Sequence, residues 1–322
     1  MSKKTYVLSL AAISGLLLSG CSGSEQPTDS TATSDELATI SVGVLESVAD
    51  LPIYLGESEG IFEKHGIELE FDNFNAGSAM VPAVLEGSTQ IGNGNLLAAE
   101  IGAQEGLPLQ VMAPSMIESG DADTDMSAIV VAKDSGITSV EELEDKKIAI
   151  NAFSSISEVA VAEVLEEAGL SSASVDILEL PFPQIPEALD SGTVDAGFLI
   201  VPFPQLNSDI LDIIASPFSE HFEGEIIGGY FASSDWLSEN EDLAQSFVDA
   251  LEEASIYTNE HEAEAREKLQ EVTELPEDVV NEVPIPKFGG DLVETPKIVN
   301  KAKDLEILKE DIDYEAVYWK WK

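Results

Sequence analysis

Apolar and polar positions change their spacing at regular intervals from Thr39 onward. Apolar runs such as TISVGVLE (39–46) have the spacing of strands, and segments such as PIYLGESEGIFEKHG (52–66) have the spacing of one helical face. Glycines end several of the helical segments, as they commonly do. Short strands that alternate with short helices predict βα units around a mostly parallel sheet.

The alternation forms two series. The first predicts strands at 39–46, 67–74, 89–94 and 107–114, with helices at 52–66, 78–87 and 95–106. The second predicts strands at 128–136, 147–153, 175–182 and 194–201, with helices at 139–146, 156–168 and 184–192. An extended segment (225–233) then precedes helical segments at 240–261, 263–272 and 295–308, which prolines separate. The pattern predicts two α/β lobes and a helical tail, which we expect to pack on the first lobe.

The N-terminus has the layout of a secretory signal peptide over residues 1–20. Two lysines precede the apolar run YVLSLAAISGLLL (6–18), which is short for a membrane span, and Leu-Ser-Gly-Cys21 follows. This run resembles the lipobox of bacterial lipoproteins, which implies that Cys21 is acylated; the alternative is an ordinary signal peptide with an incidental cysteine. Residues 21–38 are small and polar, as a flexible tether is.

Charge narrows the possible ligands. The sequence has 62 acidic and 15 basic residues, a net charge of −47, which repels nucleic acid and anionic lipid surfaces and indicates a highly soluble surface. Arg266 is the only arginine, so an anion site would have to rely on backbone N–H groups and hydroxyls.

The sequence lacks the common catalytic motifs. It contains neither Gly-x-Ser-x-Gly nor a Walker loop, and its three histidines are scattered without metal-ligand spacing. We therefore expect no catalytic residues, no metal and no cofactor.

Strand ends meet helix starts at five places in the two series. Because the carboxyl ends of parallel strands lie along one edge of a sheet, these loops gather where open α/β sheets bind ligands. Small residues there let N–H groups approach a ligand, while asparagine and serine add donors and phenylalanine adds an apolar wall. The candidate ligand-binding residues are Glu46, Ser47, Asn75, Gly77, Ser78, Asn93, Asn95, Phe153, Ser154, Ser155, Pro202 and Phe203.

The stretch NAFSSISEV (151–159) has two interpretations. Ser155 and Glu158 have the spacing of a capping box, in which each side chain bonds a free backbone N–H of the other residue. Alternatively, the helix start offers its N–H groups and partial positive charge to a small acidic or polar ligand. The residues alone leave both interpretations open.

Taken together, several segments resemble the solute-binding proteins of ABC importers of the nitrate, sulfonate and taurine type, which share the fold of thiamine-precursor-binding proteins. These are the lipobox, LPIYLGESEGIFEKHGIELEF, NAGSAMVPAVLEGSTQIGNGN, AIVVAKDSGITSVEELEDKKIAINAFSSISEVAV and LPFPQIPEALDSGTVDAGFLIVPF. The resemblance implies a two-lobed α/β fold of the type II periplasmic-binding-protein kind. It implies a first lobe at 39–130, a second at 131–227, and a return to the first with C-terminal helices at 228–322.

The resemblance also carries expectations about the site and the partners. The lobes would close over a ligand by a hinge at crossovers near 127–132 and 226–232, which adds Ser127 and Gly229 to the candidates. The start of the helix at Ser154 and Ser155 would contact the ligand's anionic group, but Glu158 would oppose a nearby anion. A taurine-like zwitterion, an aromatic acid or a heterocycle is thus as compatible as a bare sulfonate.

A monomeric binding protein, tethered to the membrane through Cys21, would hand this solute to a permease and its ATPase. An enzyme or a sensor on the same fold is the alternative.

Overall fold

The computed structural model describes residues 37–74, 79–273 and 275–320. The expected signal peptide, Cys21, most of the tether, and the candidates Asn75, Gly77 and Ser78 lie outside the described residues.

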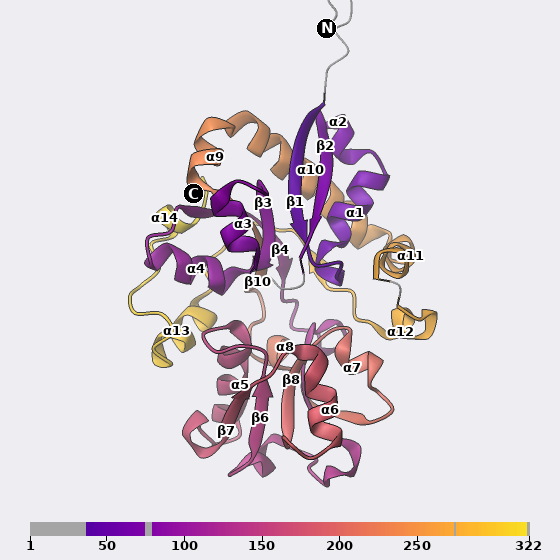
Figure 1. Cartoon of the computed structure of the whole chain (residues 1–322), viewed down its shortest axis with the longest axis vertical. Helices are drawn as coiled ribbons and strands as arrows, with labels where there is room; N and C mark the ends of the chain where they lie inside the picture. Colours follow the sequence, from indigo (N-terminus) through magenta and orange to yellow (C-terminus); the bar gives the residue numbers. More distant parts are fainter. Residues whose placement is uncertain (1–36, 75–78, 274, 321–322) are drawn as a thin grey trace, which may run out of the picture. The chain divides into compact units, whose positions relative to one another are not determined.

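Two β-sheets organise the described residues (Figure 1). The first has the strand order β11-β4-β10-β3-β1-β2. Its strands are β1 (Ala38–Val44), β2 (Ile67–Asn73), β3 (Ile91–Asn95), β4 (Leu109–Ile117), β10 (Ile226–Ser233) and β11 (Lys287–Phe288). The second has the order β7-β6-β8-β5-β9. Its strands are β5 (Ser127–Ala132), β6 (Lys147–Ile150), β7 (Asp176–Glu179), β8 (Ala196–Ile200) and β9 (Leu211–Ala215).

Most strands of each sheet run in one direction, as expected. β1 pairs in parallel with β2 and β3, and β6 pairs in parallel with β7 and β8. The antiparallel pairs include β10 with β3 and β4, and β5 with β8 and β9. β5 and β10 are the segments expected as crossovers; the structure places them inside the sheets, and the chain passes between the sheets at 118–126 and 222–225.

Helices pack against both sheets. Between β1 and β4 along the chain lie α1 (Leu51–Ser58), α2 (Ile61–Lys64), α3 (Met80–Glu86) and α4 (Leu96–Gln104). Between β6 and β10 along the chain lie α5 (Ile156–Glu167), α6 (Ile185–Asp190), α7 (Phe203–Leu206) and α8 (Pro217–His221). The C-terminal helices are α9 (Ser234–Glu239), α10 (Glu241–Glu260), α11 (Glu262–Thr273), α12 (Glu277–Glu282), α13 (Pro296–Asp304) and α14 (Tyr314–Val317).

Some helices and strands differ from the sequence expectations. The helix expected over 52–66 is two helices, because Gly60 adopts a left-handed conformation (φ 67°) between α1 and α2. The helix expected over 139–146 is a single 3₁₀ segment, Val140–Leu143. The strand β9 was not predicted, because its five residues carry neither a long apolar run nor a clear alternation.

The C-terminal tail packs on elements of both sheets, not on the first alone. α14 packs on α4 and β4, while α13 packs on α5 of the second sheet. Lys301 of α13 is 7% exposed and pairs with Glu163 and Glu166 of α5. Glu225, which precedes β10, caps α13 by accepting hydrogen bonds from the N–H groups of Lys297 and Ile298.

Candidate functional site

The loop that leaves β1 folds around the carboxylate of Asp50. Oδ2 of Asp50 accepts hydrogen bonds from the N–H of Leu45 (3.0 Å), the N–H of Ser47 (3.1 Å) and the hydroxyl of Ser47 (3.0 Å). Glu46, between the two donors, has a left-handed backbone with φ 50°. Successive N–H groups in such a turn form a concave anion site, and here that site holds a carboxylate of the chain itself.

Asp50 also joins this loop to the neighbouring strand. The Asn93 side chain of β3 donates to Oδ1 of Asp50 (3.0 Å) and to the carbonyl of Ala49 (3.3 Å). Asp50 is 1% exposed and Asn93 is 3% exposed. Burial raises the pKa of Asp50, and the hydrogen bonds from Asn93, Ser47 and Leu45 oppose that rise.

Two predicted site residues, Ser47 and Asn93, are thus held together by a residue that the sequence analysis missed. An aspartate three residues after Ser47 has capping-box spacing, which was a usable signal for Asp50.

Two other candidate residues, Glu46 and Asn95, have polar side chains at strand ends of the first sheet. The Glu46 side chain is exposed and accepts a hydrogen bond from the Asn73 amide at 2.6 Å. Asn95 ends β3 and is the N-cap residue of α4. Its Oδ1 is buried, and among the described residues it has no hydrogen-bond partner.

In the second sheet, the loop between β6 and α5 is also closed by carboxylates. Ser154 has a left-handed backbone (φ 51°), and its N–H donates to Oε2 of Glu158 at 2.6 Å. The N–H of Phe153 donates to Oε2 of Glu179 at 3.1 Å, and the Phe153 side chain is 48% exposed. The N–H groups of both residues are therefore already occupied.

The capping-box interpretation of this loop is wrong in detail. Ser155 is the N-cap residue of α5, but its hydroxyl makes no capping hydrogen bond. It donates to the carbonyl of Ala152 (2.7 Å) and lies 2.7 Å from the Ser157 hydroxyl, which bonds the Asn151 side chain. The Glu158 carboxylate accepts the N–H of Ser154 and not that of Ser155, because the left-handed backbone of Ser154 turns its own N–H toward the first turn of α5. Asn151 and Ser157 were not among the predicted residues.

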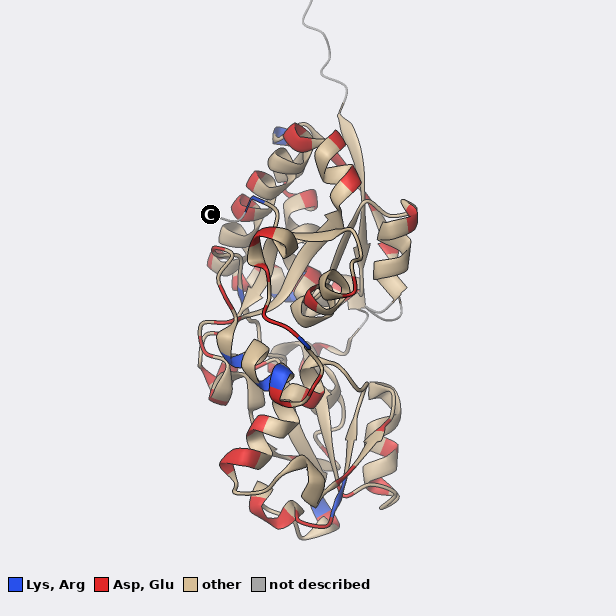
Figure 2. Ribbon diagram, turned by 90° about the vertical axis from the view of Figure 1, so that its left-hand side faces the viewer, with Lys and Arg blue, Asp and Glu red and all other residues tan. Residues whose placement is uncertain are grey.

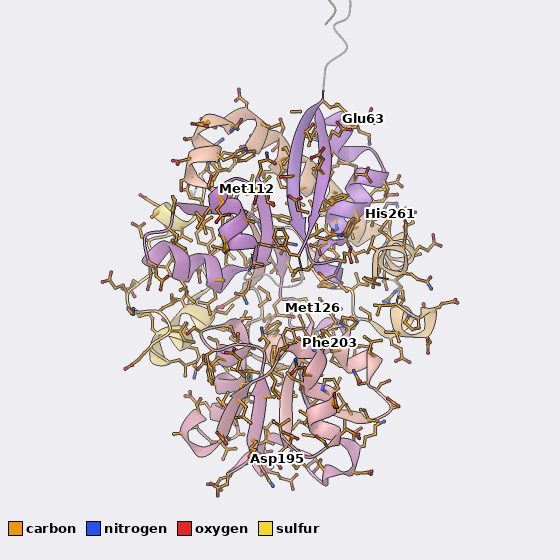
Figure 3. The ribbon with its side chains drawn as sticks, in the orientation of Figure 1. Glu63, Met112, Met126, Asp195, Phe203 and His261 are labelled. Carbon is orange, nitrogen blue, oxygen red and sulfur yellow. The ribbon has the colours of Figure 1, made fainter. Side chains whose placement is uncertain are left out.

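The loop after β8 brings the second sheet against the first. Pro202 follows a cis peptide bond, and the Phe203 ring lies 5.8 Å from the Phe182 ring, centre to centre. Val201, 5% exposed, belongs to one apolar cluster with Val48 and Leu51, which follow β1. Figure 3 shows Phe203 and Met126 between the two sheets, far from Asp195.

The two candidates on the crossover strands have structural explanations. The Ser127 hydroxyl donates to Asp125 (2.8 Å) and accepts from the N–H of Phe218 (3.1 Å), and Asp125 also binds Ser219. Ser127 thereby fixes the start of α8. Gly229 lies within β10 between β3 and β4, where a Cβ would stand 3.0 Å from a Val111 side-chain carbon.

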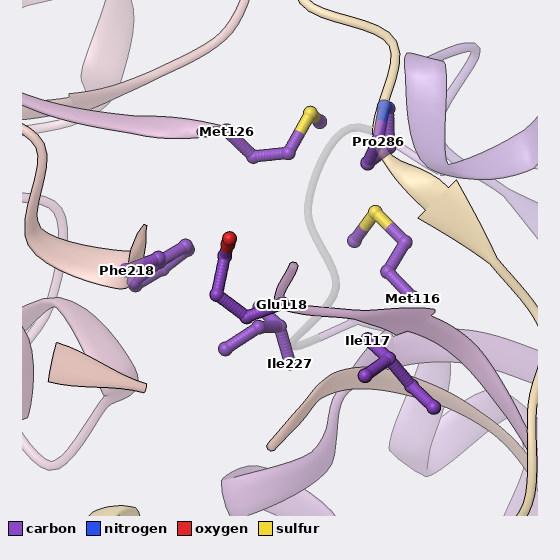
Figure 4. Close-up of a pocket in the computed structure, with 7 residues that line it drawn as sticks. All are labelled: Met116, Ile117, Glu118, Met126, Phe218, Ile227 and Pro286. Carbon is purple, nitrogen blue, oxygen red and sulfur yellow. The ribbon is translucent and has the colours of Figure 1, made fainter. Parts of the chain in front are cut away.

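A small cavity of about 10 Å³ lies where the chain crosses between the sheets (Figure 4). It is lined by Met116, Ile117, Glu118, Met126, Phe218, Ile227 and Pro286. Such a volume holds about one water molecule, so this cavity is not the place of an organic solute. Burial in these surroundings raises the pKa of Glu118 to about 7.

No cationic side chain lies in the described junction loops. Arg266, on α11, is bound to Glu262 and to the carbonyls of Val280 and Val283. Acidic residues are spread over the helices around both sheets, with few basic ones (Figure 2). Among the described residues no cluster of acids, histidines or cysteines could hold a metal ion, and no helix of that part could cross a membrane.

A family model described as "NMT1/THI5 like" matches residues 49–265, which include parts of both sheets. The chain belongs to the NMT1/THI5-like family.

Two relatives are similar to the chain in sequence. The chain is 26% identical to the taurine-binding periplasmic protein of Escherichia coli (strain K12), over 51% of this chain and 49% of that protein's length. It is 24% identical to the putative aliphatic sulfonates-binding protein of Bacillus subtilis (strain 168), over 87% of this chain and 82% of that protein.

Solved structures with the same fold include binding proteins and an enzyme. The periplasmic aliphatic sulphonate-binding protein SsuA of Escherichia coli has a TM-score of 0.72 at 18% identity, covering 88% of this chain and 92% of that one. The desulfurization enzyme DszB has a TM-score of 0.64 at 14% identity, covering 88% and 96%. The protein therefore has the periplasmic-binding-protein fold, and this fold is compatible with both binding and catalysis.

Proposed function

We propose that this member of the NMT1/THI5-like family is the solute-binding component of an ABC importer and captures a small organic solute between its two sheets. The supporting observation is the apolar cluster of Val201 with Val48 and Leu51, in which segments that follow strands of different sheets meet. Residues at these strand ends then contact one ligand from both sides. The names of the two relatives support taurine or an aliphatic sulfonate as the class of solute.

We propose that the solute is held by neutral groups. The N–H groups of Leu45, Ser47, Phe153 and Ser154 already bind carboxylates of the chain. The remaining donors of the α5 start and the free Asn95 Oδ1 suit a ligand with both acceptors and a donor, such as a taurine-like zwitterion. Exposed Phe153 and the Phe203 ring supply apolar contacts.

The proposed location is outside the cytoplasm, with a lipid on Cys21 as anchor and a permease with its ATPase as partners. The basis is the N-terminal pattern together with the periplasmic relatives. The proposed motion is closure of the two sheets toward each other, with the segments 118–126 and 222–225 as hinges.

A thermal-shift screen of the domain without its signal peptide tests the proposal. Taurine, hexanesulfonate, nitrate, an aromatic acid and a pyrimidine are the probes. Binding to the folded state raises the melting temperature, and taurine or hexanesulfonate should give the largest rise. Small-angle scattering with the probe that binds should show compaction. A shift only with nitrate or the pyrimidine would contradict the sulfonate class.

The resemblance to DszB favours testing an enzymatic alternative. Incubation of the protein with each binding probe, followed by mass spectrometry, should return the probe unchanged. Turnover of any probe would replace the binding-protein proposal with an enzyme.

A further inference from the structure

We infer that Asp50 is a positioning residue for the ligand site, because its carboxylate fixes Ser47 and Asn93 relative to each other. The effect of Asp50 on ligand binding rests on the proposed function, whereas its effect on the loop does not. Ser47 follows β1 and Asn93 lies in β3, and Asp50 is bonded to both side chains.

The geometry gives each oxygen of the carboxylate a separate task. Oδ2 receives three hydrogen bonds from the β1 loop, and Oδ1 receives the Asn93 amide. A left-handed Glu46 lies between the two N–H donors. A carboxylate that accepts several backbone N–H bonds holds such a turn in one conformation, whereas an amide has only one acceptor oxygen.

The second sheet repeats the arrangement. A left-handed residue, a serine at the N-cap and an acid three residues later occur as Glu46-Ser47-Asp50 and as Ser154-Ser155-Glu158. In both, the acid accepts an N–H of the loop, but only Asp50 is almost fully buried and bonded to a neighbouring strand. Asp50 is therefore the acid that connects two strand ends.

Asp50 has few charged neighbours. Glu46 precedes it in the loop, and Tyr54 and Tyr230 are close to it: burial raises the pKa values of both tyrosines, and the charge of Asp50 adds to that rise. No cation is paired with Asp50 among the described residues, so hydrogen bonds alone compensate its burial.

Chemical rescue provides the test. Asp50→Ala leaves a space that acetate can occupy, and acetate restores the missing acceptors. Amide hydrogen exchange of residues 45–50 should speed up in Asp50→Ala. It should slow again when acetate is added at roughly 100–200 mM, because a weak anion site fills only at a high anion concentration. Chloride at equal ionic strength should not slow the exchange. Asp125→Ala removes another buried, hydrogen-bonded aspartate and should leave exchange at 45–50 unchanged in both salts.

Taurine and hexanesulfonate are the probes for the consequence. If either binds the wild type, its affinity should fall by about tenfold or more in Asp50→Ala, as expected for loss of charge-assisted hydrogen bonds, and acetate should recover part of it. If Asp50→Ala fails to fold, Ser47→Ala is the second variant, because it removes only one of the hydrogen bonds to Asp50. Ser47→Ala should speed amide exchange at 45–50 and lower the affinity for the same probe by a smaller factor.

The outcomes separate the two proposals. Unchanged amide exchange at 45–50 in the Asp50 and Ser47 variants overturns the inference. Wild-type affinity for the probe in a variant whose exchange at 45–50 is faster also overturns it. Lack of binding of both probes to the wild type counts against the proposed solute class, and the exchange and acetate measurements then decide the role of Asp50 alone.

Discussion

The backbone N–H of Ser154 donates a hydrogen bond of 2.6 Å to Glu158, and this contact closes the loop in front of α5. Glu158 also lies in the first turn of α5, where a negative charge faces the positive end of the helix dipole. One carboxylate thus stabilises both the loop and the helix.

Replacing Glu158 with alanine should lower the free energy of unfolding by about 1 kcal/mol, because the Ser154 N–H loses its acceptor and the helix loses a favourable charge. Urea unfolding measures the change. Glu260→Ala, in the last turn of α10, is the control and should not destabilise, since this exposed acid faces the negative end of its helix dipole. Equal destabilisation by both variants would contradict this role of Glu158.

Ser154→Gly should instead raise the free energy of unfolding by roughly 0.5 kcal/mol. Its left-handed φ of 51° strains a residue with a Cβ, and glycine removes that strain at a smaller entropic cost. Ser155→Gly is the control, because Ser155 has φ −139° and bonds Ala152 through its hydroxyl, so this change should destabilise. A loss of stability in Ser154→Gly would show that its side chain has a structural role.

The periodicity of the sequence predicted the elements well because most of them depend on local spacing. The strand expected over 147–153 is β6 at Lys147–Ile150, and the helix expected over 156–168 is α5 at Ile156–Glu167. The bonds of the candidate site are less predictable, because their partners are distant in sequence. Asn93 reaches Asp50 across 43 positions, and Phe218 reaches Ser127 across 91. Capping-box spacing indicated Glu158 but not the left-handed serine that redirects it.

The stability of the protein should fall as pH rises from about 5 to about 7.5. Burial raises the pKa of Glu100 from 4.5 to about 7, so the folded state binds a proton more tightly than the unfolded chain in this interval. The stabilisation is complete below the unfolded pKa and is lost as pH passes the folded pKa. Its size is on the order of 2–3 kcal/mol.

Glu100→Gln should reduce this fall, because glutamine keeps an acceptor for Tyr318 and Thr295 without ionising. Glu118, whose pKa burial also raises to about 7, should keep the remaining part. Urea unfolding at pH 5, 6, 7 and 8 measures the effect. Glu105→Gln, at the exposed end of the same helix, should leave the pH profile as in the wild type, since no burial acts on that side chain. Parallel profiles for the wild type and Glu100→Gln would refute the assignment.

Cys21→Ala should prevent lipid attachment in a bacterial host, because Cys21 is the only cysteine in the sequence and its thiol is the proposed attachment point. Labelling with an alkyne fatty acid and cell fractionation measure the result, with release of soluble protein or retention of the uncleaved precursor as the expected outcome. Ser22→Ala is the neighbouring control and should be labelled normally. Lipid labelling of Cys21→Ala at the wild-type level would contradict the anchor.

The strand order of the first sheet has a consequence for biosynthesis. β10 lies between β3 and β4, although about a hundred residues separate β4 from β10 along the chain, so β3 and β4 have no direct pairing. The second sheet is formed by residues 127–215 without interruption. A chain that emerges from its N-terminus can complete the second sheet while the first still lacks its central strand. We therefore expect the nascent protein to keep the unpaired edges of β3 and β4 open until residue 233 has emerged.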